Sequence, residues 1–237
     1  MATKTTIERL IVCLLAPTAV VGCVALGLSA ADYDPKIDPA NFQMQVDNPY
    51  YPLVPGTTYK LIEVALGEKS DNDITVTHDT KMIMGVKCVV VHDVVTKNGA
   101  LVEDTYDWLA QDRQGTVWYF GEATQEISPG GAVSTMGSWE AGVGGAQPGI
   151  LMPAHPVPSE PYRQEYGLGV AEDMGQVTAV GETVTVPAGT FKDCVRTLEW
   201  SLLEPGNEKK WYCKGVGVVR SEATAGDVAT LISITRE

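Results

Sequence analysis

The stretch from Leu101 to Glu122 combines aromatic rings with carboxylates and is the part of the sequence best suited to chemistry. Its residues, LVEDTYDWLAQDRQGTVWYFGE, form two strand patterns joined by a turn. Five rings fall within this stretch: Tyr106, Trp108, Trp118, Tyr119 and Phe120. Because large rings bury much apolar surface, this concentration predicts the wall of a core or of a cavity.

The turn between the two patterns sets an expected register. Residues 112–116 suit a three-residue hairpin loop with Gly115 in the left-handed region. That register pairs Trp108 with Phe120 and Tyr106 with Glu122. Since side chains alternate along a strand, one face carries Asp104, Tyr106, Trp108 and Ala110 with Trp118, Phe120 and Glu122, and the other face carries Thr105, Asp107, Leu109 and Tyr119. We expect the ringed face to point inward and to take Glu122 with it.

The carboxylates support two interpretations. Glu122 with Asp104 or Glu140 could act as the acid/base pair of a secreted hydrolase or lyase, because a dry carboxylate among rings has a raised pKa. Alternatively, these acids lie in water at strand ends or pair with Arg163 or Arg196. The catalytic residues are therefore unknown, with Glu122, Asp104 and Glu140 as candidates.

A second constellation flanks a segment rich in proline and glycine. Trp139 and Glu140 open this segment and residues 162–166 close it, with Arg163 and Glu165 on one strand face. Arg163 could pair with Glu140 or Glu165 across the loop base. Together the two constellations give the candidate ligand-binding residues Tyr106, Trp108, Trp118, Phe120, Trp139, Arg163 and Glu165.

Patterns for metals and cofactors are missing. His78, His92 and His155 stand apart, and there is no CxxC pair or GxSxG elbow. Residues 142–149 are rich in glycine but lack the lysine of a phosphate loop. The Asp71-Asn72-Asp73 run indicates a turn rather than a calcium site. We therefore expect no metal and no cofactor.

The first thirty-one residues predict an export signal, because Lys4 and Arg9 precede an apolar run from Leu10 to Leu28. Cleavage after Ala31 would give a soluble mature chain. Residues 20–23 instead resemble a lipobox, which would place a lipid anchor on Cys23, and a lone transmembrane helix is a third possibility. The expected location is periplasmic or extracellular, with an outer-membrane lipoprotein as the alternative and no membrane span in the mature chain.

Composition limits the partners. The formal net charge is −13, which repels nucleic acid and anionic lipid. A small-molecule or lipid-like ligand remains compatible with this surface, as does a protein with no charged partner. The mature chain would keep Cys88, Cys194 and Cys213, which predicts one disulfide and one buried thiol. A tight turn at residues 204–207 would set Cys213 opposite a residue near Trp200, so that Cys194 and Cys213 would not face each other without a bulge.

Alternating and β-branched residues dominate after the signal. Strands are expected at 57–66, 72–79, 82–96, 100–111, 116–124, 132–139, 161–169, 175–187, 190–203, 209–222 and 228–235, with turns that include 70–73 and 97–99. This predicts an all-β antiparallel meander that curls into a half-barrel or barrel. The expected organisation is a signal peptide at 1–31, an extended lead-in at 32–56 and a single barrel-like domain at 57–237.

Residues 141–161 interrupt the regular pattern of strands. Five prolines lie in this segment, so it cannot be a central strand and predicts a long loop. The loop either packs over a sheet end or forms a lid across a barrel mouth.

Several phrases resemble a family of uncharacterised exported bacterial proteins: NPYYPLVPGTTY (48–59), DWLAQDRQGTVWYFGE (107–122), GSWEAGVGGAQPGILMPA (137–154), YRQEY (162–166) and VPAGTFKDC with the following EW and WYCKGVGVVRSE (186–222). The last part is similar to segments of periplasmic proteins with a LolA-like β half-barrel. The resemblance implies an exported β-protein, and some LolA-like proteins carry lipid or lipoprotein cargo. It transfers no catalytic residues.

These observations favour a binding or carrier module that holds a small or amphipathic ligand against the aromatic wall. A secreted hydrolase or lyase and a structural envelope protein are the alternatives. The sequence leans against an enzyme but does not decide the point.

Overall fold

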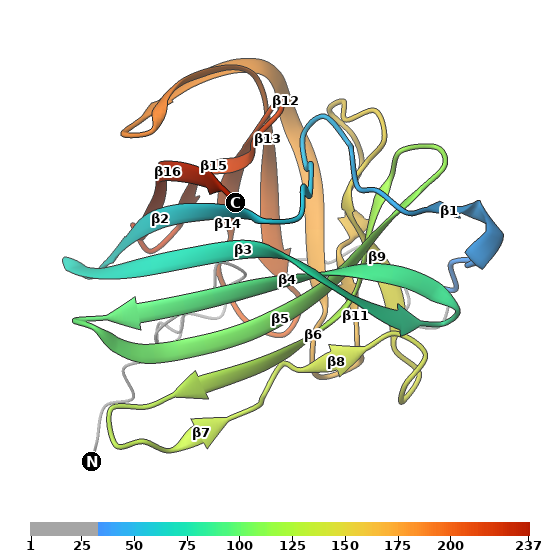
Figure 1. Ribbon diagram of the computed structural model, residues 1–237, viewed down its shortest axis with the longest axis horizontal. Helices are drawn as coiled ribbons and strands as arrows, with labels where there is room; N and C mark the ends of the chain where they lie inside the picture. Colours follow the sequence, from blue (N-terminus) through green and yellow to red (C-terminus); the bar gives the residue numbers. More distant parts are fainter. Residues whose placement is uncertain (1–32) are drawn as a thin grey trace, which may run out of the picture.

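A computed structural model describes residues 33–237, which form one antiparallel sheet curled into a nearly closed barrel (Figure 1). The predicted export signal, its cleavage site and Cys23 lie outside the described residues. In Figure 1, strands β2 to β6 run across the front and cross β12 and β13, which run behind them. The predicted all-β meander is therefore confirmed.

The elements begin with a short 3₁₀ turn, η2 (Pro39–Asn41). The strands are β1 (Phe42–Gln43), β2 (Thr57–Ala65), β3 (Glu68–Ile83), β4 (Val86–Lys97), β5 (Ala100–Asp112), β6 (Val117–Ile127), β7 (Val133–Ser134), β8 (Trp139–Glu140), β9 (Gln147–Met152), β10 (Tyr162–Arg163), β11 (Glu165–Tyr166), β12 (Asp173–Val186), β13 (Gly189–Ser201), β14 (Glu208–Cys213), β15 (Gly217–Ala223) and β16 (Val228–Arg236).

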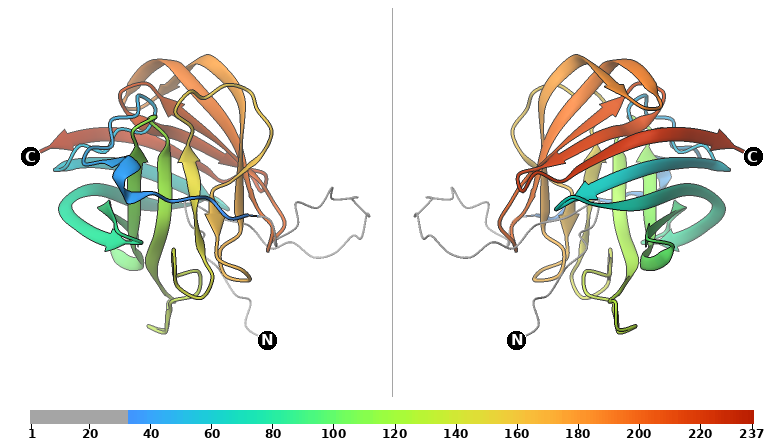
Figure 2. Two further views of the ribbon diagram at one scale, coloured as in Figure 1. Left: turned by 90° about the vertical axis from the view of Figure 1, so that its right-hand side faces the viewer. Right: turned by 90° about the vertical axis from the view of Figure 1, so that its left-hand side faces the viewer.

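The barrel nearly closes at Gln164. The sheet order is β10-β12-β13-β14-β15-β16-β2-β3-β4-β5-β6-β9-β11, so its two end strands are β10 and β11. Only Gln164 separates these strands in the sequence, and its N–H bonds to the carbonyl of Asp173 on the β12 side. The side views in Figure 2 show the sheet wrapping round one axis, with the segment before β1 crossing its outside.

Tight hairpins follow turn chemistry in most places. The predicted Asn98-Gly99 turn is confirmed: both residues have positive φ, 53° and 78°, and Lys97 pairs with Ala100. The predicted turn at residues 70–73 is wrong, because these residues lie inside β3. The chain reverses earlier, at Leu66-Gly67, where φ is 52° and 81°. Leu66 is an unusual residue for this geometry, so the sequence signal was weak.

The segment 141–161 is not a loop throughout. Residues Gln147–Met152 form β9, which lies between β6 and β11, so the prediction that this segment holds no central strand is wrong. Pro148 and Gly149 are tolerated because the ladder here is short and irregular, with a register shift between Val117 and Trp118. The remaining residues 153–161 cross to β10 without regular structure.

Other predicted strands are divided. The pattern at 132–139 gives only β7 and β8, the one at 161–169 gives β10 and β11, and the one at 209–222 gives β14 and β15 with a turn at 214–216. Gly137 and Gly215 lie in two of these breaks and have positive φ, whereas the break between β10 and β11 is the single residue Gln164. Turn geometry therefore outweighs β-branched content at these points.

The register between β5 and β6 changes at one residue. The predicted loop is confirmed, with Gly115 at φ 98°, and the expected pairing holds as far as Leu109 opposite Tyr119. A bulge at Phe120 then places Trp108 opposite Gly121, so the predicted pairs of Trp108 with Phe120 and Tyr106 with Glu122 are wrong. Gly121 has φ 130°, and a Cβ on it would lie 2.3 Å from the carbonyl oxygen of Trp139.

Cys194 and Cys213 face each other on β13 and β14 and form a disulfide, with Cα atoms 4.0 Å apart. The expectation that they would not pair is wrong, because β13 ends at Ser201 and the connection to β14 starts earlier than the predicted tight turn. Cys88 is a buried free thiol. The expected combination of one disulfide and one buried thiol is thus found among the three cysteines of the described chain.

Removal of the disulfide should lower the stability of the barrel. Cys194→Ala is expected to reduce the free energy of unfolding by about 3 kcal/mol, because the bridge closes a chain loop with a sequence separation of 19 residues. Urea denaturation measures the change. Dithiothreitol should destabilise the wild type but leave Cys194→Ala unaffected, and equal midpoints for the oxidised wild type and the variant would contradict the prediction.

The predicted lead-in packs onto the end of the barrel. β1 pairs with the end of β5, and Val46 and Leu53 are 3% and 7% exposed. The amide of Asn48 donates to the carbonyls of Gly115 and Pro153, 2.8 and 3.1 Å away. Residues 46–53 therefore cover this end of the barrel and link it to the chain that follows β9.

Candidate functional site

Glu122 lies inside the barrel. It is 3% exposed and stands opposite Asp107 in the β5–β6 ladder. The bulge at Phe120 turns Glu122 onto the face of Asp107 and Thr124, away from the face of Trp108. The prediction that Glu122 shares a face with the rings of Tyr106 and Trp108 is therefore wrong.

Asp104 and Glu140 lie on the other side of the sheet. Asp104 Oδ1 is 2.6 Å from Nε2 of His92, and Glu140 Oε2 is 2.7 Å from Nζ of Lys81. Both carboxylates keep about a third of their surface exposed. The structure thus does not bring either acid together with Glu122, so the paired-carboxylate arrangement predicted for a hydrolase is not assembled.

The predicted aromatic residues do not form one inward wall. Tyr106 is 40% exposed and stacks on His92, with ring centroids 4.2 Å apart. Trp108 is buried beneath Lys81, whose Nζ lies 3.2 Å from the ring centroid. The indole of Trp118 donates to Asp112, and the ring of Phe120 packs edge-on against Phe42. The predicted inward aromatic wall is therefore wrong. The ligand-binding roles of these residues stay predictions.

The remaining candidates lie near the seam of the barrel, where the end strands β10 and β11 meet at Gln164. Trp139 stands opposite Glu122 and packs edge-on against Tyr119 at 5.5 Å. Arg163 is 6% exposed and forms an ion pair with Glu172 at 3.4 Å, whereas Glu140 pairs with Lys81. Glu165 is 2% exposed. Burial raises the pKa of Tyr119 well above its usual value, and the negative charges of Asp107, Glu122 and Glu165 raise it further. The ion pair of Arg163 with Glu172 therefore links β10 to the residue before β12, and the binding roles of Arg163 and Glu165 remain predictions.

Buried acids from β2, β4 and β5 line one part of the interior. Burial raises the pKa of Asp93 well above its usual value, and the negative charges of Asp107, Glu103 and Glu63 raise it further. The neighbouring amide of Asn72 acts in the opposite direction. Oδ1 of Asp93 is shielded from solvent. Folding therefore favours the protonated form of Asp93.

This shift predicts a pH-dependent stability. A raised pKa in the folded state stabilises the fold fully below the unfolded value of about 3.9, and the contribution is lost as pH rises through the folded pKa. Asp93→Asn keeps the side chain neutral, so at pH 8 the variant should be more stable than the wild type. Urea midpoints at pH 4, 6 and 8 measure the difference, which should shrink toward pH 4. A difference that does not depend on pH would contradict this assignment.

A second polar network surrounds Lys210 on β14. Its Nζ lies 2.9 Å from Glu199 Oε2 and 3.3 Å from Glu208 Oε2, and Lys210 is 4% exposed. The hydroxyls of Thr197 and Tyr212 each donate to Glu199 at 2.7 Å. Burial alone would raise the pKa of Glu199, but Lys210 and these hydrogen bonds hold it below its usual value. Lys210 and Glu199 therefore have polar partners inside the barrel, which indicates a structural role for this network.

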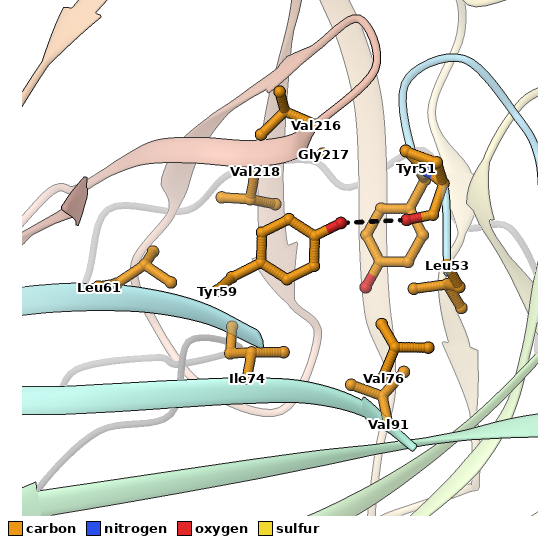
Figure 3. Close-up of a pocket in the computed structure, with 11 residues that line it drawn as sticks. Tyr51, Leu53, Tyr59, Leu61, Ile74, Val76, Val91, Val216, Gly217 and Val218 are labelled. Atoms are coloured by element: carbon orange, nitrogen blue, oxygen red, sulfur yellow. Dashed lines mark hydrogen bonds between the residues drawn. The ribbon is translucent and has the colours of Figure 1, made fainter. Parts of the chain in front are cut away.

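A small pocket lies between the lead-in segment 51–53 and residues of β2, β3, β4 and the turn into β15 (Figure 3). Its volume is about 50 Å³. The lining is almost wholly apolar: Tyr51, Pro52, Leu53, Tyr59, Leu61, Ile74, Val76, Val91, Val216, Gly217 and Val218. Figure 3 shows the ring of Tyr59 between Val218 and Ile74, with its hydroxyl directed to the carbonyl of Pro52, 3.4 Å away. Burial raises the pKa of Tyr51, and the negative charge of Asp107 raises it further, so the phenol stays neutral.

The predicted site residues do not line this pocket. Tyr59 and Leu61 alternate on β2 and Ile74 and Val76 on β3, so the strand period could have indicated their shared face. Tyr51 and Leu53 could not be placed in the same way, because the path of the lead-in across the barrel depends on tertiary contacts. The NPYYPL phrase at residues 48–53 was the sequence feature that could have drawn attention to these two residues.

No group of three or more histidine, cysteine, aspartate or glutamate residues in the described chain is arranged to hold a metal ion. Between Tyr33 and Glu237, no helix is long and apolar enough to cross a membrane. Both findings concern residues 33–237 only.

Comparison with known proteins gives no family. No protein-family model matches the chain, and no curated protein matches it. A protein of Bacteroides fragilis, provisionally described as exported and as having a YmcC-like fold, is 18% identical with a TM-score of 0.47. The match covers 78% of this chain and 98% of that protein. A provisionally described lipoprotein of Parabacteroides distasonis is 14% identical with a TM-score of 0.43, over 79% and 99% of the two chains. Neither likeness is strong enough to support a conclusion about this chain. The resemblance to an exported family and to LolA-like proteins therefore stays a prediction.

Proposed function

We propose that the chain is an exported binding protein that holds the apolar end of a small amphiphilic molecule in the pocket between Tyr51 and Val218. The apolar lining of this pocket carries the proposal. The pocket offers aliphatic side chains and two tyrosine rings to a ligand, and no charged side chain lines it. The ligand would lie here rather than against Tyr106 and Trp108.

The size of the pocket limits the ligand. A volume of about 50 Å³ is far below the roughly 300–1,000 Å³ of pockets that enclose a drug-sized molecule. Only the tip of a chain would enter, with the rest of the ligand outside. The negative charge of Asp107 acts on Tyr51, which lines the pocket, and this charge disfavours an anionic group there. An alkyl end would therefore enter first.

Export is supported by two further features. Lys4 and Arg9 precede the apolar run 10–28, and this pattern is typical of an export signal. The Cys194–Cys213 disulfide suits an oxidising compartment. The residues that line the pocket include no carboxylate, so the acid/base pair of a hydrolase would have to lie elsewhere in the barrel.

Titration with 1-octanol tests the binding proposal. The methyl signals of Leu61, Ile74 and Val76 should shift in a saturable way, because the alkyl chain would contact these residues. Ile74→Phe should weaken binding at least about tenfold by filling the pocket. The matched control is Val180→Phe, since Val180 is 46% exposed and does not line the pocket.

Two outcomes would contradict the proposal. The first is the absence of saturable shifts in the wild type, which would favour a structural envelope protein. The second is equal affinity in Ile74→Phe and the wild type, which would place octanol elsewhere.

A further inference from the structure

Two neighbouring turns of the barrel present four large aliphatic side chains to solvent. Leu168 and Val170 lie between β11 and β12, and Leu202 and Leu203 follow β13. Their exposed fractions are 56, 46, 52 and 44%. The N–H of Leu202 donates to the carbonyl of Glu172 at 3.0 Å, so the two turns are in contact. We call these four residues the turn patch.

The described chain begins beside this patch. The ring of Tyr33 lies 5.1 Å from the ring of Tyr166, which is two residues before Leu168. The hydroxyl of Tyr33 also donates to the carbonyl of Pro148 at 2.9 Å, which fixes this point on the barrel. Tyr33, the first described residue, therefore lies against the strand that leads into the turn patch.

The sequence before Tyr33 includes a segment that resembles a lipid-attachment signal. The apolar run 10–28 includes Cys23 in a lipobox-like context, ten residues before Tyr33. Ten residues span at most about 36 Å, even when fully extended. An anchor at Cys23 would therefore keep the turn patch within reach of a bilayer. A second apolar contact with the bilayer would add to the binding that such an anchor gives.

We propose that the turn patch rests on a lipid bilayer and orients the barrel on it. This proposal goes beyond ligand binding in the pocket and does not depend on it. Charge favours a bilayer over a second copy of the chain, because two copies with a net charge of −13 each repel one another. The carboxylates of Glu172 and Glu204 border the patch, so zwitterionic lipid suits it better than anionic lipid.

Hydrogen exchange of the full chain with phosphatidylcholine vesicles tests the proposal, because it locates the contact whether or not an anchor is present. Exchange in residues 167–172 and 201–206 should slow when vesicles are added, whereas the turn at 113–116 should be unchanged. Unchanged exchange in the patch would overturn the proposal. Equal protection without vesicles at high protein concentration would also overturn it, in favour of a second copy.

Variants provide an independent measurement. Replacing all four patch residues by serine should lower the vesicle partition coefficient about tenfold, because four aliphatic side chains no longer enter the interface. The matched control replaces Met44, Val143, Val157 and Val180 by serine, which are 70, 61, 60 and 46% exposed elsewhere on the surface. Thermal melting confirms that both variants fold. Equal coefficients for the patch variant and the wild type would overturn the proposal.

Discussion

Lys210→Met should lower the free energy of unfolding by about 3–5 kcal/mol, because it leaves two buried carboxylates without their cation. Lys210 contacts Glu199 at 2.9 Å and Glu208 at 3.3 Å and is 4% exposed. The pKa of Lys210 is raised, since the attraction of the two glutamates outweighs the burial that would lower it. The cation is therefore held charged inside the barrel.

Chemical denaturation measures this effect, and Lys209→Met is the matched control. Lys209 is the exposed neighbour on the same strand, so its loss should change the stability by less than about 0.5 kcal/mol. A second variant that also carries Glu199→Gln and Glu208→Gln should recover part of the loss, because the uncompensated charges are gone. Equal stabilities of Lys210→Met and Lys209→Met would contradict the role of the network.

Gly149→Ala should destabilise the barrel by at least about 3 kcal/mol, because the backbone of β9 lies too close to that of residues 163–164 to leave room for a side chain. A Cβ at position 149 would lie 2.1 Å from the carbonyl oxygen of Gln164 and 2.9 Å from that of Arg163. These are backbone atoms at the seam, so they cannot swing away as a side chain would. The φ angle of Gly149 is not in the left-handed region, so the effect is steric.

The matched control for Gly149 is Gly130→Ala. A Cβ on Gly130 meets no atom within 4 Å, and its φ is also outside the left-handed region. Thermal melting should show a large loss for Gly149→Ala and almost none for Gly130→Ala. A small loss at both positions would mean that the seam can open without cost.

Local turn chemistry predicted the parts of the fold that depend on few residues. The Asn98-Gly99 hairpin and the Asp112–Thr116 loop followed from residue types that accept positive φ, and both are present. The meander followed from alternation and from regular turns. Phe120, in contrast, adds one residue to β6 and reverses the face of Glu122. A glycine at position 121 was the only sign of this bulge, and a lone glycine does not fix where a register changes.

The candidate site depended on the same register. Once the bulge moves Glu122 inside, its predicted partners Asp104 and Glu140 remain outside with His92 and Lys81. The pocket was not predictable, since the lead-in contributes Tyr51 and Leu53 only after it crosses the barrel end. Strand β9 was missed because tertiary pairing with β6 and β11 overrides the low strand propensity of Pro148 and Gly149.

Pairing of the cysteines shows how a small error in a turn alters a long-range contact. The connection between β13 and β14 begins after Ser201 rather than at residue 204. That shift brings Cys194 opposite Cys213 and creates the disulfide. Loops with several polar residues allow more than one register, so the sequence alone could not select it.

A crystal structure of the full chain with 8-bromo-1-octanol tests the central claim most directly, because the bromine marks the end of the alkyl chain. The apolar pocket predicts an anomalous bromine peak among Leu61, Ile74 and Val218, with the hydroxyl directed toward solvent. A bromine peak only on the outer surface of the barrel, or an unchanged pocket at saturating ligand, would contradict the claim that this pocket binds an alkyl end.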